Sequence, residues 1–310
     1  MNRSKLYAAT GMLCLAAALA VICSAQQSAP GVPVSVVVTL EPKRDKTIPD
    51  VQAQDVAVFQ QRERRPVTGF TPLGHGTMQL MLLIDDSARG SFGTEINTLK
   101  QFINSLPSNT EVAVAYMRNG MAAMTQNFTQ DRAAAANSVR LPSGAGGADV
   151  SPYDSLADAI KKWPNTGAER KEIVMIGSGI EGLGGGYYSD NPYVSAGIQA
   201  AQKAGVVVYT IYNPSVGHLG HSYWRNTWGQ NFLSQVADET GGDSYIIGFG
   251  SPVSLQPFLD EIRQDLEHQY LLTFVARPQQ KSGLQPIRVS IPEKDASVAA
   301  PDKVYVKASM

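Results

Sequence analysis

Short apolar runs alternate with amphipathic stretches through the middle of the chain. Continuous runs such as residues 80–84 and 172–176 indicate strands that are buried on both faces. We expect strands at residues 80–84, 111–117, 172–176, 206–212 and 244–247, a short edge strand at 122–128, and helices at 94–106, 132–139, 151–163, 193–204, 228–240 and 255–268. This alternation predicts an α/β fold, in which a doubly wound, mostly parallel sheet is flanked by helices.

The two ends of the chain read as strands without helices. Strands are expected at residues 33–40 and 55–60 near the start, and at 270–276, 286–291 and 304–306 near the end. These small β segments from the N- and C-termini can pair with each other. The predicted division is an N-terminal β segment at 26–77, the α/β domain at 78–268 and a C-terminal β segment at 269–310.

The first 25 residues have the pattern of an export signal, in which a basic start precedes an apolar stretch at residues 6–23. Thr10 and Gly11 interrupt this stretch and leave it short of the roughly 20 apolar residues of a membrane span, which favours cleavage over retention as an anchor. We therefore expect an exported protein, periplasmic or secreted, with no integral membrane segment after cleavage. Because Cys14 and Cys23 both lie inside the signal, the exported part can use neither disulfides nor thiolate ligands.

Composition narrows the class of partner. Hydrophobic residues make up 43% of the chain, so a packed core is feasible. A net charge of −1 gives no reason to expect nucleic acid or an anionic membrane surface as partner.

The first expected strand of the α/β domain ends at Asp85, Asp86 and Ser87, and this is the main candidate for chemistry. Loops at the carboxyl ends of buried parallel strands carry the working residues of such sheets. Two carboxylates and a hydroxyl in that position could hold a divalent cation such as Mg²⁺, which prefers oxygen ligands brought together from several loops.

Here the chain resembles the von Willebrand factor type A (VWA) domain over roughly residues 78–250. The metal-ion-dependent adhesion site of that family reads D-x-S-x-S after the first strand, with a Thr on a second loop and an Asp on a third. More closely, the chain resembles the secreted VWA-related proteins of acidobacterial genomes, with a short β lead-in, the stretch SPYDSLADAIKKWP at 151–164 and a β tail. The resemblance implies a bacterial domain that binds proteins or mediates adhesion.

The chain departs from the family motif in ways that predict a degenerate metal site. Asp85 and Ser87 match the first two ligand positions, whereas Arg89 stands where the second Ser belongs. Ser151 is the candidate for the Thr, and Ser178 falls where the family has the distal Asp. The site thus loses one carboxylate and gains a cation, so Mg²⁺ binding would be weak at most. No cofactor is implied with certainty.

We hypothesise that Arg89 pairs with Asp85 or Asp86, as a fixed positive charge in place of the metal. The simpler alternative is that Asp85 and Ser87 only cap the following turn or helix. Asp149, two residues before Ser151, could restore a carboxylate, although a solvated residue in a glycine-rich loop is the more ordinary interpretation.

A literal GxGxxG at residues 177–182 directly follows an expected strand. A dinucleotide fingerprint also needs a helix that begins inside the motif and an acidic residue near the end of the next strand. Neither feature is apparent, because Gly184 to Gly186 continue the loop and the next strand ends at Asn213. Nucleotide binding is therefore not expected.

An aromatic loop is expected at residues 214–231, on the same edge of the sheet as Asp85. Its candidate ligand-binding residues are His218, His221, Tyr223, Trp224, Arg225 and Trp228. Aromatic and arginine side chains are common anchors of protein contacts. The alternatives are a small local core over the end of the sheet and, for the His-x-x-His spacing, a metal site, which the absence of a nearby carboxylate disfavours.

The sequence favours a non-enzymatic role. It contains no Gly-x-Ser-x-Gly elbow, and no histidine is spaced to pair with a nucleophile. The expected function is an exported VWA-like domain that binds a protein ligand or mediates adhesion. Two other classes stay open: a metal-assisted hydrolase using Asp85, Glu181 and a histidine, and a structural component of the cell envelope that assembles through its terminal β segments.

Overall fold

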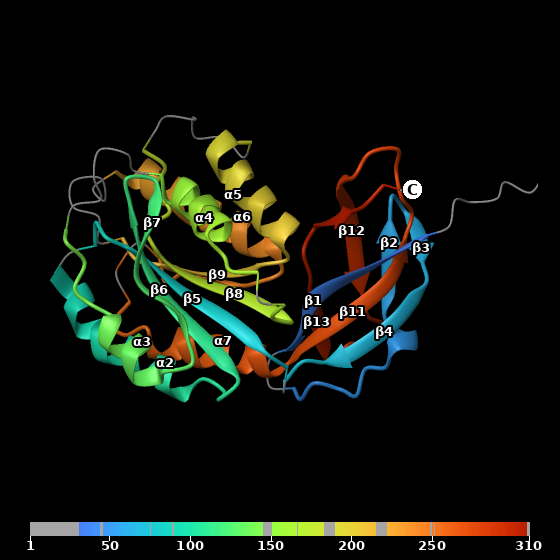
Figure 1. Cartoon of the computed structure of the whole chain (residues 1–310), viewed down its shortest axis with the longest axis horizontal. Helices are drawn as coiled ribbons and strands as arrows, with labels where there is room; N and C mark the ends of the chain where they lie inside the picture. Colours follow the sequence, from blue (N-terminus) through green and yellow to red (C-terminus); the bar gives the residue numbers. More distant parts are fainter. Residues whose placement is uncertain are drawn as a thin grey trace, which may run out of the picture.

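The apolar run that ends at Asp85 forms β5 (Met78–Asp85), a central strand of a six-stranded sheet. Its first seven residues are all buried, because helices cover both faces of the sheet. The sheet order is β10 (Ser244–Tyr245), β9 (Val207–Tyr212), β8 (Arg170–Gly177), β5, β6 (Thr110–Arg118) and β7 (Met121–Thr129). All neighbours are parallel except β7, which runs antiparallel to β6. The predicted doubly wound, mostly parallel sheet is therefore confirmed (Figure 1).

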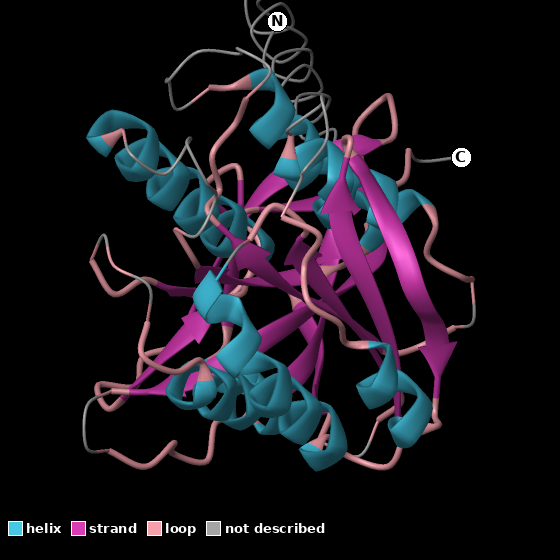
Figure 2. Ribbon diagram, turned by 90° about the vertical axis from the view of Figure 1, so that its left-hand side faces the viewer, coloured by secondary structure: helices cyan, strands magenta, loops and turns pink. Residues whose placement is uncertain are grey.

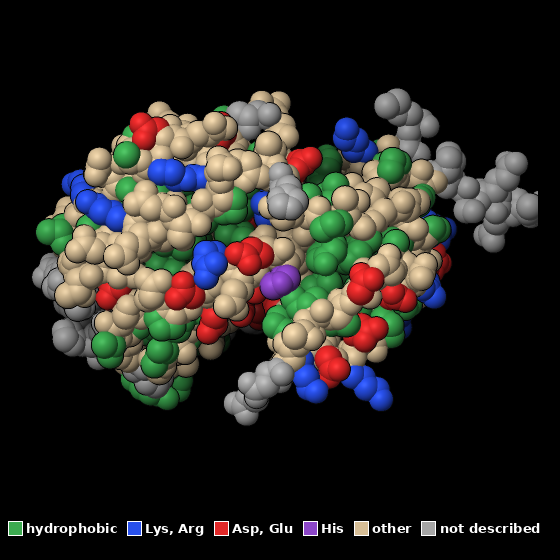
Figure 3. All heavy atoms as spheres, turned by 90° about the horizontal axis from the view of Figure 1, so that it is seen from below, with side chains coloured by type: hydrophobic (Ala, Val, Ile, Leu, Met, Phe, Trp, Pro, Cys, Tyr) green, Lys and Arg blue, Asp and Glu red, His purple; other side chains and the backbone are tan. Residues whose placement is uncertain are grey.

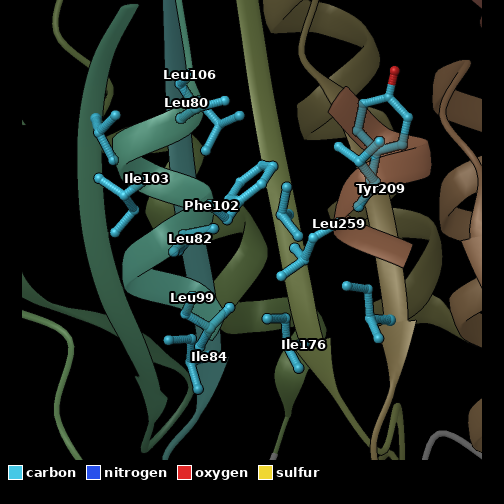
Figure 4. Close-up of a cluster of buried hydrophobic side chains, with 14 of the residues drawn as sticks. Leu80, Leu82, Ile84, Leu99, Phe102, Ile103, Leu106, Ile176, Tyr209 and Leu259 are labelled. Atoms are coloured by element: carbon cyan, nitrogen blue, oxygen red, sulfur yellow. The ribbon is translucent and has the colours of Figure 1, made fainter. Parts of the chain in front are cut away.

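Three helices pack on each face of this sheet. One face carries α2 (Ile96–Ser105), α3 (Arg132–Ser138) and α7 (Gln256–Glu267), and the other carries α4 (Pro152–Lys161), α5 (Pro192–Ala204) and α6 (Tyr223–Thr240). Side chains spaced three and four apart on α2 meet alternate residues of β5, which is the packing that helical and strand periodicity requires. Figure 4 shows Leu99, Phe102 and Ile103 of α2 against Leu80 and Leu82 of β5.

The strands from the two chain ends form a β-sandwich beside the α/β part (Figure 1). One sheet has the order β13 (Ala296–Ala299), β1 (Val32–Pro42), β11 (Gln269–Ala276) and β4 (Val67–Pro72), and the other has β14 (Lys303–Val306), β12 (Gly283–Ser290), β2 (Ala57–Gln60) and β3 (Glu63–Arg65). The strands β1 and β11 pair antiparallel from Val32↔Ala276 to Thr39↔Gln269. Segments far apart in the sequence thus share one core, as the pairing of terminal β segments predicts.

The strands β3, β4 and β13 were not predicted from the sequence. All three are short, and β4 contains Gly69 and ends at Pro72, two residues that weaken a strand pattern. Pairing with β11 holds β4 in place, and the register shifts at Thr273/Phe274 of β11. These strands exist because of tertiary pairing rather than local propensity.

A buried polar network joins the α/β part to the sandwich at the amino end of β8. Arg170 Nη1 donates to the Leu266 carbonyl at 2.7 Å and to Gln269 Oε1 at 3.3 Å. Gln269 Nε2 donates in turn to Glu172 Oε1 at 3.1 Å and to the Tyr209 hydroxyl at 3.3 Å. Burial raises the pKa of Glu172 to about 8, although the nearby Arg170 charge lowers it.

The structure, a computed structural model, describes residues 31–43, 46–74, 76–88, 90–144, 151–165, 167–182, 190–214, 222–248, 250 and 252–308. Within these ranges, no helix is both long enough and apolar enough to cross a membrane. On the face drawn in Figure 3, acidic and basic side chains are interspersed, and hydrophobic side chains gather on the part that belongs to the sandwich. The predicted export signal at 1–25 lies outside the described residues.

Candidate functional site

The candidate site lies where the carboxyl ends of β5 and β8 meet. From β5 the chain continues to α2 on one face of the sheet, and from β8 it continues to α5 on the other face. This divergence makes a topological switch point, the place where doubly wound sheets bind ligands. We call the loops at the carboxyl ends of the parallel strands the carboxyl-end rim. Figure 2 looks onto this end of the molecule.

Asp85 is the last residue of β5 and is held by three donors. Its Oδ1 accepts hydrogen bonds from the Ser87 backbone N–H at 2.8 Å and from the Ser87 hydroxyl at 2.6 Å. The backbone N–H of Ser178, after β8, also donates to this carboxyl group. Burial raises the pKa of Asp85 above its ordinary value, and these hydrogen bonds oppose the rise. Gly177 permits the close approach, since a Cβ there would lie 3.0 Å from the Cβ of Asp85.

The neighbouring carboxylate of Asp86 is fully buried and serves as an anchor for another loop. Arg140 Nη1 lies 2.8 Å from its Oδ1, the Ser143 backbone N–H donates to the same oxygen at 2.9 Å, and the Ser143 hydroxyl donates to Oδ2 at 2.9 Å. Burial alone would raise the pKa of Asp86, but the hydrogen bonds from Arg140 and Ser143 outweigh it and hold the pKa below its usual value. Arg118 Nη1 adds a longer contact at 3.9 Å.

Arg140 is itself fixed by Tyr116 of β6. Its guanidinium carbon lies 3.8 Å from the centre of the Tyr116 ring, and the Arg140 backbone N–H donates to the Tyr116 hydroxyl at 2.8 Å. The hydroxyl donates to the Arg140 carbonyl at 2.6 Å. The cation that pairs with Asp86 therefore comes from the segment after α3. The hypothesis that Arg89 pairs with Asp85 or Asp86 stays a prediction, because Arg89 lies outside the described residues.

Ser151 is the N-cap of α4, where its hydroxyl oxygen accepts from the Asp154 backbone N–H at 3.1 Å. The same hydroxyl donates to Glu181 Oε2 at 2.7 Å, and both side chains are buried. Ser178, also buried, accepts from the Ile180 backbone N–H at 3.2 Å. The three serines of the predicted site are therefore all engaged in hydrogen bonds within the protein.

These donors do not fit a magnesium ion well. Mg²⁺ requires near-octahedral oxygen coordination, but Asp85 Oδ1 already accepts two hydrogen bonds, both from Ser87. Among the residues that the structure describes, no group of three or more His, Cys, Asp or Glu side chains is placed to hold a metal ion. Asp149 lies outside the described residues, so its role stays a prediction.

The aromatic candidates lie on a helix, which corrects the predicted loop at 214–231. Ser222 caps the amino end of α6, so Tyr223, Trp224 and Arg225 occupy its first turn. The sequence prediction began this helix at residue 228, because the exposed aromatic turn obscures the helical pattern. The sequence of α6 is only weakly amphipathic, so its hydrophobic pattern does not indicate where the helix begins. The Ser222 cap marks that position. His218 and His221 lie outside the described residues.

The start of α6 is close to the switch point. A Cβ on Gly229 would overlap the carbonyl oxygen of Ser178, so the helix packs directly on the loop that donates to Asp85. Trp228 lies partly buried, with its ring centre 5.6 Å from that of Phe232, and packs against the core. Tyr223 and Trp224 point outward, with ring centres 6.1 Å apart in an edge-to-face arrangement. The predicted proximity of the tryptophan-bearing segment to Asp85 is thus present.

The large hydrophobic side chains that are most exposed lie mostly on the carboxyl-end rim. Among the described residues, the large exposed ones are Met121, Leu141, Tyr223, Trp224, Ile247, Val253 and Tyr305. All except Tyr305 lie on or beside the rim. Met121 follows β6, Leu141 follows Arg140, and Tyr223 and Trp224 follow β9. Ile247 and Val253 lie between β10 and α7, and Gln230 of α6 donates to the nearby Gly248 carbonyl at 2.6 Å.

Sequence reasoning missed Arg140 and Ser143. Both are distant from Asp86 in the sequence, and neither belongs to a motif. Only the placement of α3 against β6 and β7 brings them to the carboxylate.

The fold and the placement of Asp85 define the class of protein. The order β7-β6-β5-β8-β9-β10 is that of a doubly wound sheet, with the candidate site at its switch point. This doubly wound sheet is the fold that the sequence resemblance to the VWA domain implies.

No protein-family model matches the chain, and the curated proteins contain no match either. Among solved structures, an aerotolerance-related membrane protein from Bacteroides fragilis is similar at 14% identity and a TM-score of 0.45, over 61% of this chain and 98% of that one. Three N-terminal domains of the type V pili tip protein Mfa5 from Porphyromonas gingivalis are similar at 10% identity and a TM-score of 0.45, over 92% and 68%. The SpRpn10 VWA domain is similar at 15% identity and a TM-score of 0.40, over 60% and 95%. The resemblance to acidobacterial secreted proteins stays a prediction.

Proposed function

We propose that this protein is an exported, non-enzymatic binding domain that takes a protein ligand at the carboxyl-end rim and does so without a metal ion. The observation that supports this most is the concentration of exposed hydrophobic side chains on that rim, described above. Large apolar side chains that gather at one end of a soluble domain are typical of a protein contact. Export is proposed from the pattern of residues 1–25 alone.

The electrostatics of the switch point favour a metal-independent contact. Asp85 accepts from Ser87 and Ser178, and Asp86 is neutralised by Arg140. Both carboxylates are therefore satisfied inside the protein, and a divalent cation would have to displace some of those hydrogen bonds. The degenerate site then serves as a rigid support for the rim rather than as a ligand-bridging centre.

The ligand contact can be tested by replacing the exposed aromatic pair with serine, in Tyr223→Ser/Trp224→Ser. Binding partners would be recovered from envelope and secreted fractions of the source organism, with the intact protein and with the variant, in the presence and absence of a chelator. A specific partner should be retained by the intact protein under both conditions and lost with the variant. The matched control is Tyr305→Ser, which removes an exposed aromatic ring away from the rim and should leave that partner bound.

Calorimetric titration with Mg²⁺, Mn²⁺ and Ca²⁺ tests the metal-independent part, with Asp85→Ala as the control. No saturable binding is expected. Saturable binding that disappears in Asp85→Ala would overturn this part of the proposal and favour a working adhesion site. A screen of ester and phosphoester substrates with and without metal tests the non-enzymatic part, since metal-dependent turnover would favour the hydrolase.

A further inference from the structure

A groove at the opposite end of the sheet from the carboxyl-end rim forms a second surface. One wall is the carboxyl end of α5, the other is the edge strand β14, and part of β1 lines it between them. Its lining also includes the amino ends of β8 and β9, which places it far from Asp85. The groove has a volume of about 370 Å³, and a shallower hollow continues from it along α5 past Gly283 and Leu284 of β12. We call this surface the amino-end groove.

The strand β14 presents an unpaired backbone edge to this groove. It pairs antiparallel with β12 on one side only, from Gly283↔Val306 to Pro286↔Lys303. The Ile287 N–H donates to the Asp302 carbonyl at 2.8 Å, so Ile287 and Asp302 are a hydrogen-bonded pair of the ladder. This pair determines which residues of β14 direct their backbone groups toward β12. In an antiparallel ladder every second residue turns its backbone groups away from the partner strand. Those residues are Lys303 and Tyr305.

The outward N–H and C=O groups of Lys303 and Tyr305 have no hydrogen-bond partner within the part of the chain that the structure describes. The strand is also held firmly, because the Asp302 N–H donates to the Glu239 carbonyl of α6 at 3.2 Å. A fixed edge with free donors and acceptors is a template for an added strand.

The charged residues that line the groove indicate what kind of peptide strand would bind there. Lys171, Lys203 and Lys303 line it against the single acidic residue Glu169. Lys171 donates to the Ala204 carbonyl at 3.3 Å, and Lys303 lies 3.9 Å from Glu239. Counted together with Glu239, the lining has three lysines against two carboxylates, so the groove keeps a small net positive charge. Its remaining lining is largely aliphatic, from β1, β9 and β14, so an alternation of acidic and apolar side chains complements it.

We propose that the amino-end groove binds an extended acidic peptide segment of another protein, which adds to the edge of β14 as a further strand. The backbone of the segment pairs with Lys303 and Tyr305, its acidic side chains meet the lysines, and its apolar side chains meet the aliphatic lining. A small anion would use the lysines but would leave the strand edge unpaired. The proposal is independent of the rim, because the two surfaces share no residue.

The test uses a fluorescein-labelled short peptide of alternating glutamate and valine residues, with fluorescence anisotropy on the purified protein. Two control peptides carry lysine in place of glutamate, or N-methyl groups on alternate amides. Lys203→Glu and Lys303→Glu reverse the charge of the groove, and Lys294→Glu makes the same change at an exposed site outside it. Tyr305→Pro removes an outward N–H, a loss that an edge strand tolerates, together with the Tyr305 ring, and Tyr305→Ala removes the ring alone as its control.

We expect saturable binding of the acidic peptide and none of the lysine peptide. The charge reversals in the groove should weaken binding about tenfold or more, whereas Lys294→Glu should not. Relative to Tyr305→Ala, Tyr305→Pro should weaken binding about tenfold, the effect of losing one hydrogen bond of about 1.4 kcal/mol, and N-methylation, which removes one such bond at each methylated amide facing β14, should weaken it at least as much. Slower amide exchange at Tyr305 on adding the peptide would support the added strand directly.

Three results would overturn the proposal. Equal affinity for the acidic and lysine peptides would exclude charge selection, and full binding by both Tyr305→Pro and the N-methylated peptide would exclude strand addition. Concentration-dependent dimers that Tyr305→Pro abolishes would identify a second copy of the chain as the occupant instead. Circular dichroism of Tyr305→Pro is the folding control, and the N-methylated peptide tests the same step on the unaltered protein.

Discussion

The buried carboxyl group of Glu172 should make the stability of this protein fall as the pH rises from about 4.5 to about 8. Its pKa is raised from 4.5 to about 8, chiefly by burial. A raised pKa means that the folded state holds a proton that the unfolded state has already released. The contribution to stability is therefore complete below about pH 4.5 and is lost as the pH rises through about 8. Glu172→Gln, a neutral side chain of the same shape, should remove this dependence.

The size of the effect follows from the difference between the two pKa values. Each pH unit corresponds to 1.36 kcal/mol, so a difference of about 3.5 units corresponds to about 5 kcal/mol over the whole range. Between pH 5 and 7.5 the free energy of unfolding of the intact protein should lose about 1.4 kcal/mol per pH unit from this group. The pKa of Asp265 is also raised, to about 7, so Asp265 makes stability fall with rising pH in both the intact protein and Glu172→Gln. The contribution of Glu172 is therefore the difference between the pH slope of the intact protein and the pH slope of Glu172→Gln.

Urea unfolding monitored by tryptophan fluorescence at several pH values between 5 and 8.5 provides the measurement. We expect Glu172→Gln to equal or fall slightly below the intact protein at pH 5 and to exceed it by several kcal/mol at pH 8.5. Glu267→Gln, the same change at an exposed position on α7, should leave the slope unaltered. Parallel slopes for the intact protein and Glu172→Gln would refute the reasoning, since they would mean that Glu172 ionises alike in both states.

Three further substitutions test the core and the support of the rim, each by denaturant or thermal unfolding. Asp86→Asn should cost about 1–3 kcal/mol, because it breaks the ion pair between the buried carboxylate and the half-exposed Arg140 and weakens the bonds from Ser143; an unchanged midpoint would contradict the anchoring role. Gly229→Ala should cost about 1–3 kcal/mol through overlap with the Ser178 carbonyl, and a neutral result would mean that the loop yields freely. Leu82→Ala should cost about 2–5 kcal/mol by leaving a cavity in the core, whereas a loss below 1 kcal/mol would show that the core collapses to fill it.

The central sheet could be predicted because its strands are buried on both faces. Such strands are continuous apolar runs, and Met78–Asp85 ends abruptly at two aspartates, so both the strand and its functional end are visible in the sequence. Helices α4 and α5 were also predicted, at residues 151–163 and 193–204, and the structure shows that Ser151 and Asn191 cap them and that a proline follows each cap.

What could not be predicted depends on partners that are distant in the sequence. The strand β4 is held by β11, about 200 residues later, and its own residues give little indication of a strand. The first turn of α6 reads as an aromatic loop because Tyr223 and Trp224 face solvent instead of forming an apolar stripe. The pair of Asp86 with Arg140 has no sequence signature, whereas Arg89, which lies outside the described residues, is suggested as a partner by its closeness in the sequence.

The adjacent aspartates Asp85 and Asp86 have different partners at the switch point. Their arrangement supports a ligand contact that depends mainly on apolar surface. Asp86 is committed to Arg140 and Ser143, so its charge is neutralised where no ligand reaches it. Ser178, which the sequence resemblance aligns with the distal Asp of the VWA motif, supplies a backbone N–H to Asp85. Little uncompensated charge then remains at the centre of the rim. Affinity for the proposed ligand must come from the exposed side chains around it, so binding should depend only weakly on salt and on chelators.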